Sequence, residues 1–279
     1  MKIIEGQSFD EERALYAARD VRIVDCRFEG PADGESALKE SRQIEVADSL
    51  FVLRYPLWHT TDFKLRKVKM ADTARAAIWY AKNGIITDSD LGGIKAVRES
   101  SDISIRDTKI NSSEFGWKSS GIRLENVDIT SEYLFLDSRD ISLENVDMHG
   151  KYSFQYVENM NINNSRLDTK DAFWHTKNVT VRDSVVKGEY LAWYSENLTL
   201  INCEIIGTQP LCYCKGLKLI NCTMKETDLA FEYSDVEADI IGSIDSVKNP
   251  RSGRITADAV GEIIMDSDIV ECRGEVIVR

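Results

Sequence analysis

The composition of the chain suits a folded protein with a large core and argues against a nucleic acid partner. The chain has 279 residues, 43% of them hydrophobic, and a formal net charge of -12. Its sixteen Gly and four Pro are too few for a disordered or collagen-like sequence. Because a strongly acidic surface repels phosphate backbones, we expect no nucleic acid partner.

The beginning of the sequence does not resemble a secretion signal. Residues 1–13 carry charges where a signal peptide needs an apolar run. No segment approaches the roughly 18 consecutive apolar residues that a membrane span requires. We therefore expect no membrane partner, and the expected location is the cytoplasm.

Residues 14–26 and 78–89 share one order of strand, turn and strand, which predicts that a coiled architecture begins near residue 14. Residues 1–13 are then expected to form an N-terminal cap. A surplus loop is expected at residues 30–36, whose Gly, Pro and Asp residues favour turns.

A short motif then recurs every 19 residues without a slip. One copy reads Ile122-Arg-Leu-Glu-Asn-Val-Asp-Ile129, with apolar residues at alternate positions on each side of an Asn. Alternation of this kind predicts strands rather than helices. The Asp or Asn of the motif falls at Asp88, Asp107, Asn126, Asn145, Asn164, Asp183, Asn202 and Asn221.

A fixed period of this length with a strand signature is typical of solenoids, in which each coil buries its apolar face against the next coil. The Asp/Asn positions mark one corner, because these residues tolerate a left-handed backbone. A second Asp/Asn series and a Gly-rich bend give a triangular cross-section. Because the six-residue submotif of left-handed helices is missing, a right-handed winding is favoured.

The predicted fold class is all-β: a single-stranded, right-handed parallel β-helix of about twelve coils, mostly of 19 residues. The repeat crosses the midpoint of the chain without a linker, so residues 1–279 are expected to form a single domain. Regular coils are expected over residues 14–245. Residues 246–279, where the pattern weakens, are expected to form irregular coils and a C-terminal cap that shields the last strand.

Four segments resemble a bacterial family classified as domain of unknown function 3737. They are residues 54–59, 76–84, 171–175 and 207–214, and the likeness extends over nearly the whole chain. The resemblance implies a right-handed parallel β-helix of pectin-lyase type. It implies no reaction and no functional residues.

Cysteine spacing gives no indication of a metal site, and no cofactor is expected. Cys203 and Cys222 occupy the same motif position in adjacent coils, about 4.8 Å apart, which a disulfide can span. In a reducing compartment they are more simply explained as buried small side chains. Cys212 and Cys214 lack a second pair of ligands at zinc-site spacing.

The third side of the coils is rich in aromatic residues that align in columns. The tryptophan column reads Tyr16, Trp58, Trp79, Arg98, Trp117, Leu136, Gln155, Trp174, Trp193, Cys212 and Phe231. The next position, the outer column, reads His59, Tyr80, Glu99, Lys118, Asp137, Tyr156, His175, Tyr194, Tyr213 and Glu232. Two positions before the tryptophan column, the back column includes Tyr133, Tyr152, Asp171 and Tyr190.

Charged members assign the outer column to the surface, because Glu99, Lys118 and Asp137 are costly to bury unpaired. If side chains alternate strictly along the strand, the tryptophan column then points into the core. If the outer column points inward instead, the tryptophan column is exposed. Under either parity an aromatic strip with ionisable groups lies along one face.

An exposed aromatic strip of this length predicts a ligand or partner. Either a carbohydrate, stacked on the rings, or a protein partner fits the strip, and a second copy of the chain is one such protein. The candidate ligand-binding residues are His59, Tyr80, Arg98, Trp117, Tyr133, Tyr152, Tyr156, Asp171, Trp174, Tyr190, Trp193, Tyr194 and Tyr213.

The alternative function is that of a carbohydrate-active hydrolase or lyase, with its active site along the same aromatic strip. Carboxylates one and two coils apart would be about 4.8 and 9.6 Å apart, close to the separations that glycosidases use. Asp137 would be an acid or base, and His175 its proton-transfer partner. Lys118 or Arg98 would stabilise developing negative charge, and Glu99 lies two coils from Asp137. The competing structural interpretation is a ladder of charge pairs between neighbouring strands.

Overall fold

The computed structural model describes residues 1–30 and 34–279. Of the surplus loop expected at residues 30–36, residues 31–33 lie outside the described part. The contacts divide the chain into two compact units, Met1–Ser142 and Leu143–Arg279. No helix among the described residues has the length and apolar character needed to cross a membrane.

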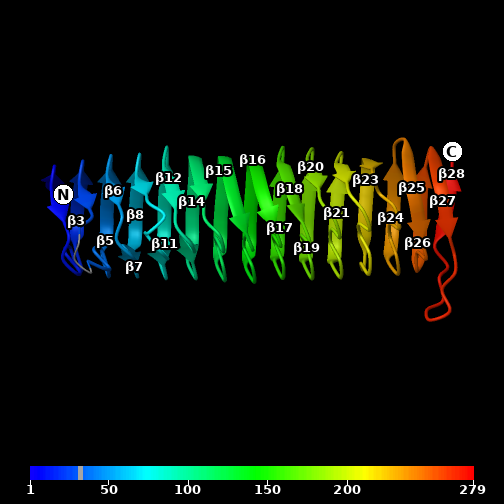
Figure 1. Cartoon of the computed structure of the whole chain (residues 1–279), viewed down its shortest axis with the longest axis horizontal. Helices are drawn as coiled ribbons and strands as arrows, with labels where there is room; N and C mark the ends of the chain where they lie inside the picture. The colour runs from blue at the N-terminus through cyan, green and yellow to red at the C-terminus, as the bar shows by residue number, and fades with distance from the viewer. Residues whose placement is uncertain (31–33) are drawn as a thin grey trace. The chain divides into compact units, whose positions relative to one another are not determined.

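The first unit is built from short strands that follow one another along the chain (Figure 1). They are β1 (Lys2–Glu5), β2 (Ser8–Phe9), β3 (Arg19–Val24), β4 (Arg27–Phe28), β5 (Arg42–Ala47), β6 (Leu50–Phe51), β7 (Leu57–Trp58), β8 (Thr61–Arg66), β9 (Lys69–Met70), β10 (Ile78–Trp79), β11 (Lys82–Thr87), β12 (Asp90–Gly92), β13 (Val97–Arg98), β14 (Ser101–Asn111) and β15 (Ser120–Glu132).

The coils of this unit contribute their strands to three parallel stacks. The first stack pairs β1, β3, β5, β8, β11, β14 and β15 in register. The second contains β2, β4, β6, β9, β12 and the later part of β14. The third, on the aromatic side, contains β7, β10 and β13. Strands that are parallel to their counterparts one coil away define a β-solenoid.

The second unit repeats the scheme. Strand β16 (Arg139–Lys151) contains the point of division. The strands that follow are β17 (Glu158–Asn163), β18 (Arg166–Lys170), β19 (Lys177–Arg182), β20 (Val185–Lys187), β21 (Glu196–Ile201), β22 (Glu204–Ile206), β23 (Leu217–Lys225), β24 (Asp235–Ile240), β25 (Ser243–Lys248), β26 (Ser252–Ala257), β27 (Ala259–Ile264) and β28 (Glu275–Val278). Their pairing is parallel throughout the described partners.

The Asp/Asn column forms the corner between the first and second stacks. Asn202 has a φ of 53° and Asn221 a φ of 55°, which is the left-handed conformation that Asn adopts more readily than most residues. Their amides form a ladder: Asn221 Nδ2 donates to Asn202 Oδ1 at 2.8 Å, and Asn202 Nδ2 donates to Asp183 Oδ1 at 2.9 Å. The 19-residue spacing is therefore a direct contact in space.

The core of each unit consists of the apolar residues that the alternation predicted to face inward. Ile103 and Ile105 of β14 are 1% and 0% exposed, while the residues between and after them face outward or lie half-buried. Stacked phenylalanines continue the core from coil to coil, with Phe28 and Phe51 at 4.6 Å between ring centroids. Close packing of this kind holds each coil on its neighbour.

The described residues make about 14 turns, slightly more than the twelve expected. The difference arises at both ends. Residues 1–13, expected as a cap, supply β1 and β2, which pair with β3 and β4 in the coil register. At the other end, residues 246–279 continue through β26, β27 and β28. The single-domain interpretation of residues 1–279 stays a prediction.

Candidate functional site

The outer column lies on the surface, and the reason is a bend of the backbone. Every residue of this column from His59 to Tyr213 has a positive φ, for example 52° at Tyr80 and 58° at Tyr156. Tyr156 is 51% exposed and Tyr194 is 45% exposed. A left-handed residue turns the chain, so the strict alternation of a strand does not extend through this position.

Neither of the two alternatives left open for the tryptophan column holds strictly, because of this bend. The indoles of Trp79 and Trp174 are half-buried at the surface, next to the outer column. The residue before each tryptophan is the one that enters the core, as Ile78 and Phe173 do. Within each unit, the two columns therefore lie on the same face, which we call the aromatic face.

Indole nitrogens fix most of the tryptophan side chains to the next coil. Trp117 Nε1 donates to the carbonyl oxygen of Tyr133 at 2.8 Å, and Trp174 Nε1 donates to that of Tyr190 at 2.7 Å. Gln155 makes the same contact, from Nε2 to the carbonyl of Asp171 at 3.1 Å. The back column is thus joined to the tryptophan column through its main chain.

A column of buried hydroxyl groups, which sequence reasoning missed, anchors the bend from inside. In the first unit the hydroxyl of Ser119 accepts from the N–H of Ser100 at 3.2 Å, and that of Ser138 accepts from the N–H of Ser119 at 3.1 Å. Each hydroxyl also donates to a nearby carbonyl, as Ser138 Oγ does to Gly116 at 2.7 Å. The signal in the sequence is a Ser or Thr two residues after the tryptophan position in most coils.

In the first unit the aromatic face holds charges among its rings. Trp58 and Trp79 stack at 5.1 Å, with Lys39 Nζ 3.9 Å above the Trp58 ring and Arg98 above the Trp79 ring. Cations placed over indole rings are attracted by the ring quadrupole. His59 Nδ1 lies 3.0 Å from Oε1 of Glu40.

Glu99 is tied into this cluster. Burial by itself raises the pKa of Glu99, but hydrogen bonds from Tyr80 and from Arg98 outweigh burial and leave that pKa below its usual value. The Arg98 Nε to Glu99 Oε1 distance is 2.7 Å. Glu99 is therefore an ionised partner of Arg98 and Tyr80.

Lys118 and Asp137 lie on adjacent coils, because the N–H of Lys118 donates to the carbonyl of Leu136. In the part of the chain that the structure describes, no ion pair joins Lys118 to Glu99 or to Asp137. The charge ladder expected along these strands is thus replaced by the local pair of Arg98 with Glu99. Asp137 is exposed in the first unit, and His175 belongs to the second. Their catalytic roles stay a prediction.

The second unit carries the longest run of stacked rings, which we call the ring ladder. It consists of Tyr156, His175, Tyr194, Tyr213 and Tyr233. The first three gaps are 4.9, 5.0 and 4.7 Å between ring centroids, with ring planes within 11° of parallel. Tyr213 and Tyr233 follow at 6.0 Å and 40°.

The end of the ladder differs from the expected column. Tyr233, rather than Glu232, follows Tyr213, because the coil between them has one extra residue. Glu232 takes the preceding position, where its carbonyl accepts from the N–H of Tyr213 at 2.7 Å. Burial, with the negative charge of Glu232, raises the pKa of Tyr213 to about 12. Its phenol therefore keeps its proton at neutral pH.

Beside the ladder, Trp174 and Trp193 stack at 5.4 Å with planes 4° apart. Tyr190 of the back column meets Trp193 edge-on at 5.4 Å. Asp171, between Tyr152 and Tyr190 in that column, has a raised pKa, first because of burial and also because of Glu189, while Lys170 acts in the opposite direction.

The cysteines carry no described site. All six are free thiols, and Cys203 and Cys222 are buried at 2% and 0% exposure. Among the residues with described positions, no three His, Cys, Asp or Glu side chains gather as metal ligands would.

Comparison with known proteins supports the fold. A family model described as "Protein of unknown function (DUF3737)" matches residues 2–278. PfbA, a surface adhesin of Streptococcus pneumoniae, is similar with a TM-score of 0.60 at 8% identity, over 82% of this chain and 84% of that one. That likeness and the parallel pairing confirm the predicted fold class, a right-handed parallel β-helix of pectin-lyase type.

Further solved structures match less well. The A-module of the mannuronan C-5 epimerase AlgE6 from Azotobacter vinelandii has a TM-score of 0.35 at 10% identity, over 98% of this chain and 87% of that one. A GH87 alpha-1,3-glucanase catalytic domain has a TM-score of 0.27 at 10% identity, over 99% and 61%. A comparison with curated protein sequences finds no match. Likenesses at these identities concern the fold alone.

Proposed function

We propose that this chain, which belongs to the family of proteins of unknown function DUF3737, binds a protein partner through the aromatic face of its coils. The observation that carries the proposal is the orientation of the rings in the ring ladder. His175 lies between Tyr156 and Tyr194 with nearly parallel planes on both sides. Each ring thus covers the faces of its neighbours and turns its edge outward.

This orientation argues against sugar binding by ring stacking. A sugar stacks on an aromatic side chain by covering a ring face, and a gap of about 5 Å between parallel rings leaves no room for a second molecule. The indoles of Trp174 and Trp193 cover one another in the same way. The ring faces between these stacked neighbours are occupied within the protein.

Ring edges and phenol hydroxyls suit a protein surface better. Tyrosine offers a large, rigid, amphipathic contact at low entropic cost, and interfaces are enriched in it. The phenol of Tyr213, like any tyrosine hydroxyl at neutral pH, is protonated and donates. A partner that supplies backbone carbonyls or carboxylates, together with apolar side chains, would pair with this row.

The size of the exposed strip also supports binding. Tyr156 and Tyr194 leave about half of their surface in water, and they belong to one continuous row. Isolated surface aromatics are common, but a continuous row is a feature of interaction sites. Stacking between coils covers the ring faces, whereas the outward edges are exposed for contact with a partner.

The test compares two double variants in binding experiments. Tyr156→Ser with Tyr194→Ser removes two edges of the ladder, and Ile220→Ser with Ile241→Ser removes two exposed apolar side chains elsewhere. Proteins retained from an extract of the source cells by wild-type chain would be identified, purified and titrated by calorimetry. We expect the ladder variant to lose at least tenfold in affinity and the control variant to bind as wild type does.

Three results would contradict the proposal. One is equal affinity of the purified partner for the wild-type chain and the ladder variant. Another is saturable quenching of tryptophan fluorescence by neutral oligosaccharides that the ladder variant loses. The third is a partner whose binding is lost only in the control variant. If sedimentation shows a dimer that the ladder variant dissociates, the protein partner is a second copy of the chain.

A further inference from the structure

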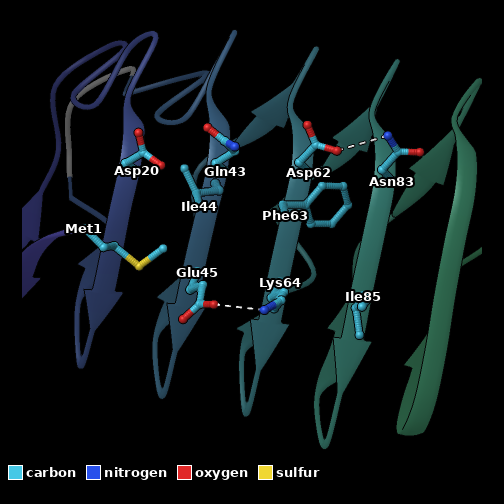
Figure 2. A pocket seen from close by; sticks show the side chains of 10 residues that line it. All are labelled: Met1, Asp20, Gln43, Ile44, Glu45, Asp62, Phe63, Lys64, Asn83 and Ile85. Atoms are coloured by element: carbon cyan, nitrogen blue, oxygen red, sulfur yellow. Dashed lines mark hydrogen bonds and ion pairs between the residues drawn. The ribbon is translucent and has the colours of Figure 1, made fainter.

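A groove runs across the outer face of the first stack in the first unit, on a different side of the coils from the aromatic face. Figure 2 shows the residues that line its first part. It consists of two adjoining hollows of about 400 and 450 Å³, which share Asn83 and Ile85. Hollows of this size fall in the range of small-ligand sites. The main chain at Ile44 and Phe63, whose side chains point into the core, contributes to the floor.

One wall of the groove is a regular row of hydrogen-bonding side chains. Each coil contributes one residue with a positive φ, and acids alternate with amides along the row. Figure 2 shows the row from Asp20 to Asn83 on successive strands, with Asn83 Nδ2 donating to Asp62 Oδ1 at 3.0 Å. Neighbouring members are separated by the rise of one coil, about 4.8 Å. The row contains Asp20, Gln43, Asp62, Asn83 and Asp102.

The opposite wall mixes charge with an apolar contact. Lys64 Nζ and Glu45 Oε1 form an ion pair at 3.0 Å, and Arg123 lies farther along. Between the two cations, Ile85 is 43% exposed at a position where the neighbouring coils carry Lys64 and Ser104. An exposed Ile in a row of polar residues adds an apolar surface to the groove.

We propose that this groove binds an extended neutral glycan that lies across the strands, with about one sugar residue per coil. Hydroxyl groups both donate and accept, so they match a row in which carboxylates accept and amides do both. The apolar C–H face of a sugar ring would lie on Ile85. An extended pyranose chain advances by about one coil rise per residue, whereas an extended peptide advances by only about 3.3 Å per residue.

Charge decides between glycan classes. The groove is lined by five carboxylates, those of Asp20, Glu45, Asp62, Asp102 and Asp140, against the two cations Lys64 and Arg123. Their summed field repels a polyuronate, and the chain as a whole, these residues included, has a net charge of -12. The same field attracts a cationic peptide, but an extended peptide advances by only about 3.3 Å per residue and therefore falls out of step with the coils.

The experiment is a calorimetric titration with defined probes. These are hexasaccharides of neutral β-1,4- and β-1,3-linked hexoses and pentoses, a hexameric oligouronate, and a Lys/Arg-rich peptide of similar length. Ser104→Trp places an indole in the groove beside Ile85, at an outward position. Thr199→Trp makes the same change at the equivalent outward position of β21 and serves as the matched control.

We expect at least one neutral hexasaccharide to bind, with at least a tenfold loss of affinity in Ser104→Trp and none in Thr199→Trp. Equal urea unfolding midpoints of the two variants would show that the loss is local. The inference is overturned if no neutral hexasaccharide binds, if only the oligouronate or the peptide binds, or if Ser104→Trp binds as the wild type does. The ladder variant leaves this groove intact. A failure of the protein-partner proposal and a failure of the glycan proposal can therefore be told apart.

Discussion

The ring of Phe63 fills the space that a side chain at Gly84 would need. The two residues are register partners on β8 and β11, and a Cβ atom added to Gly84 would lie 2.2 Å from Cζ of Phe63. Phe63 is 1% exposed, so the ring cannot move into solvent without losing its burial. Glycine normally weakens a strand, and here it makes room for the largest side chain of the stack.

Gly84→Ala is therefore expected to destabilise the protein by about 1–3 kcal/mol, because overpacking forces strain on a close-packed core. Combining it with Phe63→Leu should recover part of that loss, since the shorter side chain vacates the site. Urea unfolding of the two single variants and the double variant measures the coupling. Additive effects of the two substitutions would contradict the contact.

Trp174→Phe tests the hydrogen bond from the indole to the carbonyl of Tyr190. Losing one buried hydrogen bond should cost about 1 kcal/mol beyond the change in ring size, since the carbonyl is left without that donor. Trp58→Phe is the matched control, because Nε1 of Trp58 is buried and has no hydrogen-bond partner among the described residues. Equal unfolding free energies for the two variants would show that the indole bonds do not hold the coils.

The corner column predicts a difference between two substitutions at Asn202. Asn202→Gly loses the amide contacts to Asp183 and Asn221 but keeps the left-handed backbone at no steric cost. Asn202→Ala loses the same contacts and adds about 1–2 kcal/mol of backbone strain. We expect thermal unfolding to rank the proteins as wild type, then Gly, then Ala. If Ala were at least as stable as Gly, the backbone strain would not limit this corner.

Asp171 predicts a pH dependence of stability. Burial first, and Glu189 second, raise its pKa in the folded state. The stability that a raised pKa contributes is fully present below the pKa of the unfolded chain, about 3.9, and is lost as the pH rises through the folded value. Asp171→Asn should therefore be more stable than the wild type at pH 7, and this advantage should disappear near pH 3.

The matched control for Asp171→Asn is Asp137→Asn, at an exposed carboxylate. Removing any one carboxylate from a chain with a net charge of -12 relieves some repulsion, and the control measures that general gain. Urea unfolding from pH 3 to pH 8 gives both curves. The expectation fails if the gain at pH 7 is the same for both variants.

Several features of the fold could be predicted from the sequence because they repeat. The separation of Asp107 and Asn126 by 19 residues predicted neighbours in space, and Asn126 Nδ2 indeed donates to Asp107 Oδ1 at 3.0 Å. The inward positions of β14 followed from alternation in the same way. The number of coils was underestimated because terminal coils lack the motif, although β1 pairs in register with β3.

The aromatic face shows where sequence patterns reach their limit. The residues of each column were identified, but the parity rule assumed an uninterrupted strand, and the left-handed residue after each tryptophan interrupts it. The extra residue before Tyr233 shifted the last member of the column. The orientation of the rings decides whether a sugar could stack on their faces or only meet their edges. This orientation cannot be predicted from the order of residues.

By itself, the sequence determined which residues stack on one another. A coil can bury its apolar residues only against a neighbour with the same pattern, and the sequence therefore repeats with a fixed period. Tertiary structure alone decided which atoms face the solvent on the aromatic face and along the groove. Backbone bends, ring planes and the groove beside Ile85 depend on contacts between coils, and such contacts form only once the backbone of each coil has its neighbours in place.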